Sequence, residues 1–337
     1  MLAGLGRLGF ELPARAHGSS HGPMFVLGVF VTLISLERAV AADATWTYAA
    51  PVLSCAGGLG ALFAPRLASV VSFAGTAVLV AVNLALVRRQ TAAFTAIMLL
   101  GSMVLFASVG GWVFGLPLHA VAPAWMAFFV LTILAERLEF SRLAPTPRWA
   151  TAMLGALTTT YAALVLASAI SPGLTPHAGR LMGLLLIAIA VWEGSFDLAR
   201  RTVRRGGLPR FAAVGVLLGT AWLAIAGVVS IRYGWLAGGP SYDAILHAVF
   251  VGFVLSMVFA HAPIILPAVA RVEFPFHPVL YGALALLHLG LAARIVGDLG
   301  DSFALRRTGA LVSALALPAF FFSAFLSRGL TKRAGGP

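Results

Sequence analysis

Charged residues and cysteines are scarce in this sequence, and each shortage excludes a class of protein. Only 10% of the 337 residues are Asp, Glu, Lys or Arg, whereas a soluble domain carries about 25%. Hydrophobic residues make up 60% of the chain and the mean hydropathy is +0.97, so a soluble fold of this length could not bury its apolar surface in one core. The single cysteine, Cys55, excludes an intramolecular disulfide and a cluster of thiolate metal ligands. The composition therefore predicts a chain that is solvated by lipid.

Motifs that bind nucleotides or support hydrolysis are also missing. The sequence contains no Walker phosphate loop, no dinucleotide fingerprint and no helical zinc-protease motif, which argues against an ATP-driven pump and against a hydrolase of the soluble type. The net charge of +12 does not indicate a nucleic-acid partner, because the basic residues lie between apolar segments and no soluble basic domain is present to read bases.

Eleven apolar runs divide the chain. A spanning helix needs about 20 apolar residues, and Pro or Gly marks several of the breaks. The runs predict an all-α fold, a polytopic transmembrane helix bundle of about eleven spanning helices, which forms a single domain over residues 1–337 with the lipid bilayer as its partner. The second and third runs are also compatible with a short re-entrant pair. The runs cover residues 22–41, 46–64, 67–87, 92–115, 118–135, 149–171, 178–199, 210–231, 243–263, 277–297 and 304–327.

The distribution of basic residues predicts the orientation in the membrane. With eleven crossings, eight of the 23 Lys and Arg residues lie on the side of the N-terminus and 15 on the other side. Cytoplasmic loops carry the excess of positive charge. The sequence therefore predicts a multi-pass protein of the cell inner (plasma) membrane, with residues 1–20 as a short segment outside and residues 328–337 as a short cytoplasmic tail.

A weak internal repeat links two of the runs. Residues 30–38 (FVTLISLER) and 129–137 (FVLTILAER) match at five of nine positions with an offset of 99 residues. Four helices separate equivalent points, so a duplication would be parallel and not inverted. Leucine-rich segments also match by chance, and both origins remain open. The Glu-Arg pairs that end the two segments are interpreted as interfacial anchors.

The eight histidines are the most informative polar residues. Polar groups at helix ends and within spans are costly, so they mark candidate functional positions. His288 lies in the middle of the tenth run, and the others fall near the two predicted faces. Those near the outer face are His17, His21, His119, His177 and His247, and those near the inner face are His261 and His277.

Two histidines before the first run form a candidate metal pair. His17 and His21 are spaced i, i+4, so in a helix both imidazoles would share one face, as a metal site requires. Met24 could add a thioether ligand that suits copper or haem iron. The alternative is a polar entry to the first helix at the membrane surface.

Three further histidines are candidate cofactor ligands. Asp243 and His247 open the ninth run at i, i+4, where the carboxylate could orient the imidazole or, with Ser241, cap the helix. His261 lies 14 residues beyond His247, about 21 Å along a helix, so one metal could not take both. His288 is either a hydrogen-bonding link between helices or a haem ligand.

Acidic residues within the runs support a different reading. Glu193 and Asp197 share one face of the seventh run, and together with Asp243 and a histidine they could form a proton or ion path. Arg294 and Asp298, at i, i+4, are expected to pair locally. These features would suit a secondary transporter. The many Ala and Gly positions would also suit a non-catalytic subunit of a membrane complex.

Three stretches resemble the NnrS family of haem- and copper-containing membrane proteins, which are distantly similar to the catalytic subunit of haem-copper oxidases. They are residues 21–30 (HGPMFVLGVF), 247–253 (HAVFVGF) and 291–296 (LAARIV). The resemblance implies haem b held by histidines, with iron and a possible nearby copper, and a role in redox chemistry, gas sensing or nitric oxide tolerance. The partners would be a small gas such as nitric oxide or a redox protein. The ligand role would fall on His21 and His247, and on His261 and His288 as further candidates.

The chain departs from that resemblance in two respects. NnrS-like proteins have about twelve helices, against the eleven expected here. The chain has no tyrosine spaced like the cross-linked histidine–tyrosine pair of the oxidases, so oxygen reduction is not expected. No residue is assigned a catalytic role on this basis.

Overall fold

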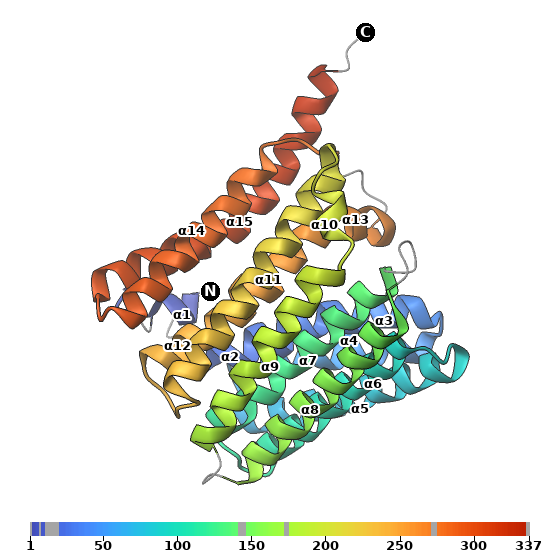
Figure 1. Ribbon diagram of the computed structural model, residues 1–337, viewed down its shortest axis with the longest axis vertical. Helices are drawn as coiled ribbons and strands as arrows, with labels where there is room; N and C mark the ends of the chain where they lie inside the picture. The colour runs from blue at the N-terminus through green and yellow to red at the C-terminus, as the bar shows by residue number, and fades with distance from the viewer. Residues whose placement is uncertain are drawn as a thin grey trace. The chain divides into compact units, whose positions relative to one another are not determined.

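The computed structural model describes residues 2–6, 8–10, 20–140, 146–171, 175–270 and 275–334. Within these ranges the chain consists of helices and short connections without a strand, so the predicted all-α fold is confirmed (Figure 1). Ten of the described helices are long and apolar enough to cross a membrane. In lipid a helix satisfies every backbone hydrogen bond within itself. The protein is therefore a multi-pass membrane protein, as the composition predicts.

The helices begin and end at residues that the sequence marks. Pro65 occupies the first turn of α5 (Pro65–Arg89), and Pro240 opens α12 (Pro240–His247), where a missing backbone N–H costs nothing. Gly115, with φ of 100°, lies between α6 (Ala93–Val113) and α7 (Leu118–Phe140). These breaks separate long apolar segments that would otherwise continue as helices.

The chain forms two compact units, whereas the single domain expected over residues 1–337 stays a prediction. The first unit comprises Met1–Glu139 and Thr151–Thr175. Its first span is one rod made of α2 (His21–Pro23), η2 (Met24–Val31) and α3 (Thr32–Ala42). α7 is the most enclosed span, with 83% of its apolar window buried, and Phe129 of α7 meets Phe30 of the first rod edge to face. The unit also contains α1 (Leu2–Gly6), α5, α6 and most of α8 (Arg148–Ile170).

The run at 46–64 differs from a regular spanning helix. It forms the short 3-10 helix η3 (Thr45–Tyr48) and the twelve-residue helix α4 (Ala49–Gly60). Thr47 donates to the Ala39 carbonyl at 3.3 Å, and Ser20 donates to the Ala61 carbonyl at 3.0 Å. The segment therefore runs back along the whole first rod, although neither helix alone is long enough to span. A 3-10 helix rises more per residue than an α-helix, which lets 17 residues (45–61) return to the level of Ser20.

The second unit comprises Phe140–Ala150 and Pro176–Pro337. Its helices are listed here in chain order: α9 (Thr175–Phe196), α10 (Ala199–Thr202), α11 (Gly207–Tyr233), α12, η6 (Ala248–Leu255), α13 (Ser256–Ala270), α14 (Leu280–Leu299) and α15 (Phe303–Ala334). α14 and α15 form a long antiparallel pair (Figure 1). Their backbones approach closely at Gly290 and Gly309, where an added Cβ would overlap the neighbouring helix. Small residues allow such close packing within a membrane.

Each unit contains an eight-residue π-helix, a feature that no sequence signal predicted. η2 belongs to the first unit and η6 to the second, and the fifth residue of each is a glycine. Gly28 of η2 lies against the backbone of Gly58, and Gly252 of η6 lies against the indole of Trp222. In both units a histidine precedes the π-helix, at His21 and at His247. π-helical turns are rare and occur frequently at functional sites, so these two positions direct attention to the histidines.

Candidate functional site

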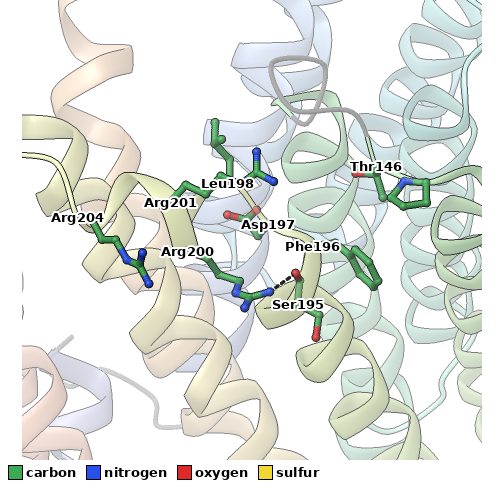
Figure 2. A pocket seen from close by; sticks show the side chains of 9 residues that line it. Thr146, Ser195, Phe196, Asp197, Leu198, Arg200, Arg201 and Arg204 are labelled. Atoms are coloured by element: carbon green, nitrogen blue, oxygen red, sulfur yellow. Dashed lines mark hydrogen bonds between the residues drawn. The ribbon is translucent and has the colours of Figure 1, made fainter.

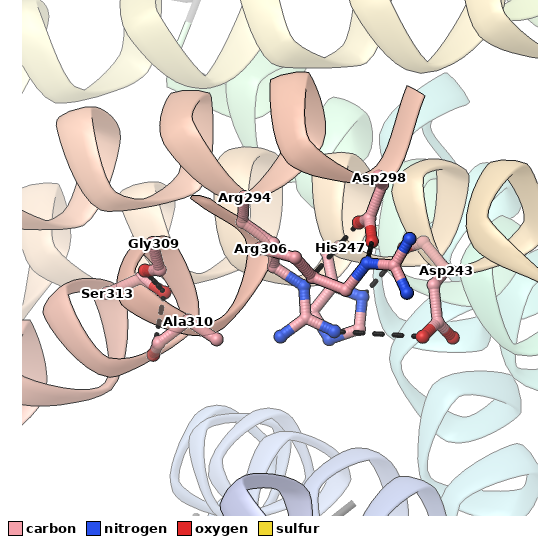
Figure 3. Close-up of polar contacts among 8 residues, drawn as sticks. All are labelled: Asp243, His247, Arg294, Asp298, Arg306, Gly309, Ala310 and Ser313. Atoms are coloured by element: carbon pink, nitrogen blue, oxygen red, sulfur yellow. Dashed lines mark hydrogen bonds and ion pairs between the residues drawn. The ribbon is translucent and has the colours of Figure 1, made fainter. Parts of the chain in front are cut away.

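A cluster of four charged side chains lies where α12 begins, α14 ends and α15 begins (Figure 3). The Arg294 guanidinium lies 3.7 Å from the Asp243 carboxylate and 3.7 Å from that of Asp298. Arg306 approaches Asp298 from α15 with a 2.6 Å contact between Nε and Oδ1. The Asp298 side chain is fully buried, and the two positive and two negative charges compensate each other. We refer to Asp243, Arg294, Asp298 and Arg306 as the charge cluster.

The structure confirms the predicted pair of Arg294 and Asp298 and adds two partners. The sequence offered no signal that Asp243 would contact Arg294, because the two residues are far apart in the chain. Arg306 could have been suspected, since a turn of three residues separates α14 from α15. The alternative that Asp243 and Ser241 cap the helix is not observed, because the cap position of α12 is Gly239 and no side chain bonds there.

His247 lies beside the charge cluster, and its ring is held by a backbone carbonyl. Its Nδ1 lies 2.6 Å from the backbone carbonyl oxygen of Asp243. A carbonyl only accepts hydrogen bonds, so Nδ1 carries the proton and the neutral ring has its lone pair on Nε2. The sequence suggested that the Asp243 carboxylate would orient this ring. The backbone of Asp243 does so instead, while its carboxylate meets Arg294.

His261 has the same ring state. Its Nδ1 lies 2.8 Å from the Met257 carbonyl oxygen, and its ring stacks on that of Phe140 with centroids 6.2 Å apart. Histidines that bind a metal usually donate the second ring N–H to a carbonyl or carboxylate, which fixes the tautomer. His247 and His261 both have this arrangement.

His288 has the opposite arrangement. The Trp222 indole donates to Nδ1 at 2.8 Å, so that nitrogen is an acceptor. The Ser256 hydroxyl donates its proton to the Gly215 carbonyl at 2.7 Å. The same hydroxyl oxygen lies 3.3 Å from His288 Nε2, so it accepts the Nε2–H. Both ring nitrogens of His288 thus take part in hydrogen bonds that join α14 to α11 and α13. Of the two readings that the sequence left open, this geometry favours the link between helices, and the haem-ligand role stays a prediction.

The N-terminal candidates belong to the first unit. His21 begins α2, with its ring 5.5 Å from that of Phe25. Gly4 of α1 lies over the same imidazole, and a Cβ at that position would come within 2.8 Å of His21 Cε1. Met24 is half-buried, one turn further along in η2. His17 lies outside the described residues, so its pairing with His21 stays a prediction.

A metal site built wholly from side chains is not formed by the described residues. Among them, no three His, Cys, Asp or Glu side chains gather at a distance suited to one ion. Haem makes a smaller demand on the protein, because the macrocycle provides four ligands to the iron and one or two side chains complete the set.

The two Glu-Arg pairs of the internal repeat meet in the first unit. Arg38 lies 2.8 Å from Glu37 and 3.9 Å from Glu136, and it contacts the sulfur of Met98 at 3.0 Å. Arg38 is only 7% exposed. The interpretation of Glu37-Arg38 as an interfacial anchor is therefore wrong, because the guanidinium is held inside the unit by carboxylates from α3 and α7.

The three acidic candidates for an ion path are not brought together. Glu193 is fully buried, and Asp197 accepts the Ala199 N–H at 2.6 Å. Asp243 of α12 lies near the other end of α9: its neighbour Tyr242 meets the Trp235 ring edge to face, and the Trp235 backbone packs on Gly179. Gly179 and Asp197 are 18 residues apart, about 27 Å along a helix. One continuous path would have to bridge that distance.

Residues 1–328 match the family model described as a domain of unknown function (DUF8744), and the chain therefore belongs to this family. No curated protein matches the chain. No solved structure matches it either. The assignment of a function accordingly depends on the geometry described above.

Proposed function

We propose that this protein binds haem within the membrane through histidine Nε2, with His247 as the principal ligand of the second unit. The observation that carries this proposal is the hydrogen bond from His247 Nδ1 to the Asp243 carbonyl. It places the lone pair on Nε2, the nitrogen that an axial ligand uses. The π-helix that begins at the next residue is the second support.

His261 is the second candidate ligand of this unit, but it would serve a different site. The same ring state supports it. It lies 14 residues beyond His247, about 21 Å along a helix, and one iron cannot bind both. His21 is the candidate of the first unit, since it also precedes a π-helix. Copper held by His17, His21 and Met24 belongs to the same proposal and has less support, because it needs several side chains around one ion. His247 is the separate metal candidate of the second unit.

A b-type haem with one axial position open would bind a small gas such as nitric oxide, whereas two histidines would produce a low-spin redox centre. The chain would therefore act in gas sensing, nitric oxide tolerance or electron transfer with a redox partner. The resemblance to NnrS-like proteins at residues 21–30 and 247–253 supports the same class of function. Neither arrangement requires the protein to be an enzyme.

The test is an absorption spectrum of the detergent-purified protein, oxidised and then reduced with dithionite, with iron and copper measured on the same sample. We expect a Soret band that shifts on reduction and loses at least half of its intensity in His247→Gly. Added imidazole should restore the band, because it replaces the missing ligand. His277→Ala is the matched control, since Nδ1 of His277 accepts from the Val279 N–H at 3.2 Å and has the other ring state.

Two outcomes would contradict the proposal. One is a colourless protein without stoichiometric iron after expression with sufficient haem. The other is equal loss of the band in His247→Gly and His277→Ala. A colourless protein would favour the alternative of a proton- or ion-coupled transporter, for which the fully buried Glu193 is the strongest observation, or a non-catalytic membrane subunit.

We also infer that the N-terminus lies outside the cell inner membrane and the C-terminus in the cytoplasm. The ten long helices among the described residues and the returning segment η3–α4 would make eleven crossings, and 15 of the 23 basic residues would then face the cytoplasm. Alkaline phosphatase, which is active only outside, should be active after fusion within the connection between α6 and α7 and inactive after fusion at residue 334. Activity at the second position and not at the first would reverse the orientation.

A further inference from the structure

A basic pocket lies at the end of α9, independent of the histidines. It has a volume of about 570 Å³ and lies within the second unit. Its walls come from residues 146–147, which precede α8, and from residues 195–204, which include the end of α9 and the short helix α10 (Figure 2). Three candidate spans have an end beside the pocket: one ends at Phe196, and the other two begin at Arg148 and at Gly207. We therefore expect the pocket at the point where these spans leave the membrane, at the depth of the lipid headgroups.

Positive charge exceeds negative charge in this pocket. Three arginines line it, Arg200, Arg201 and Arg204, against one carboxylate, that of Asp197. Asp197 accepts the Ala199 N–H at 2.6 Å, and Arg200 donates to the Ser195 carbonyl at 2.5 Å. Within the part of the chain that the structure describes, Arg201 and Arg204 form no ion pair, and both are exposed. Two guanidinium groups are thus available to a ligand.

The chemistry of the walls selects the ligand. Guanidinium groups bind phosphate through two parallel hydrogen bonds, and three arginines against one aspartate leave a positive pocket that attracts the negative charge of a phosphodiester. Phe196 and Leu198 add apolar surface to the same pocket, which suits the glycerol and first acyl carbons of a lipid. Basic pockets between spanning helices on the cytoplasmic side bind anionic headgroups. The volume accommodates a phosphodiester headgroup but not a folded protein segment.

We propose that this pocket binds the phosphate group of an anionic phospholipid, with Arg201 and Arg204 as its principal ligands. The lipid would fix the α9–α10–α11 connection at the membrane surface. Free phosphate has the same binding chemistry, and the experiment must therefore separate the two sources. This proposal does not depend on haem binding.

The test uses the full-length protein in detergent and native mass spectrometry with phosphatidylglycerol, and with phosphatidylcholine as the zwitterionic comparison. The variant is Arg201→Gln with Arg204→Gln. Its matched control is Arg205→Gln with Arg210→Gln, two exposed arginines that do not line the pocket, one in the α10–α11 connection and one in the first turn of α11. The variant loses charge-assisted hydrogen bonds to the phosphate, so we expect it to bind phosphatidylglycerol at least about tenfold more weakly than the wild type. The control variant should bind phosphatidylglycerol about as well as the wild type does. The binding of phosphatidylcholine should differ little among the three proteins.

Inorganic phosphate, measured by calorimetry on the same proteins, forms the second arm. If it binds the wild type, displaces phosphatidylglycerol and is lost in the pocket variant, the site is a phosphate site and its ligand is the free ion. If the pocket variant loses the binding of phosphatidylglycerol and inorganic phosphate does not bind the wild type, the ligand is the lipid. Equal weakening in the pocket variant and its control, or no binding of either probe to the wild type, would overturn the proposal.

Discussion

Asp298→Ala is expected to lower the free energy of unfolding by about 3–5 kcal/mol, the cost of breaking a buried charge pair. Asp298 is 3% exposed and faces Arg294 at 3.7 Å and Arg306 at 2.6 Å. Removing its carboxylate leaves two arginines with only Asp243 between them, at 3.7 Å from Arg294. The loss should be measured by equilibrium unfolding in mixed micelles, followed by circular dichroism.

The adjacent turn provides the control for this prediction. Asp301 is exposed and adopts a left-handed conformation, with φ of 53°, which asparagine tolerates well. Asp301→Asn therefore removes one negative charge close to the cluster and should change stability by less than about 0.5 kcal/mol, as is usual for surface positions. If both variants were equally stable, the charge cluster would not hold α14, α15 and α12 together.

Gly290→Ala is expected to destabilise the protein by about 1–3 kcal/mol or more, because a methyl group would be forced into a closely packed contact. At this position α14 lies directly against α15, and an added Cβ would overlap the backbone nitrogen of Ser313. The obstacle is backbone and not a flexible side chain, so a rotamer change cannot relieve it. The two helices would have to move apart, and the same unfolding measurement reports the cost.

The same helix offers a matched substitution with a different outcome. Gly282, in the first turns of α14, has no atom within 4 Å of an added Cβ. Alanine is a better helix former than glycine by up to about 1 kcal/mol, so Gly282→Ala should be neutral or stabilising. Equal destabilisation by the two substitutions would mean that the close contact between α14 and α15 at Gly290 does not determine the effect.

The charge pairs illustrate how far sequence reasoning reaches. Arg294 and Asp298 could be paired from their spacing, because residues four apart share a helix face. Arg38 and Glu136 are 98 residues apart in the chain, and no local rule joins them, although they end the two copies of the suggested repeat. Asp243 and Arg294 are likewise joined only by the packing of α12 on α14. For these last two pairs the local pattern predicted a charge at a helix end but not its partner on another helix.

The candidate ligands divide in a similar way. The sequence identified His247, His261 and His288 as candidate ligands, near the outer face, near the inner face and in the middle of a run, but it did not predict their ring states. The structure separates them by ring state: two donate Nδ1–H to the carbonyl four residues earlier, and the third accepts from Trp222. The ring state depends on whether a neighbouring helix supplies a donor, as α11 does for His288, or whether the ring donates to a carbonyl of its own helix, as in His247 and His261. A single sequence contains no signal for that choice.

The sequence by itself determined that the protein is an all-helical, multi-pass membrane protein, because long apolar segments leave lipid as the only suitable solvent and helices as the only way to satisfy the backbone there. Tertiary structure alone decided that the 46–64 segment returns as a 3-10 helix followed by a short α-helix, that π-helices follow His21 and His247, and that buried charges meet across helices. These features depend on which helices approach closely and at which residues, and contacts between distant segments determine that approach.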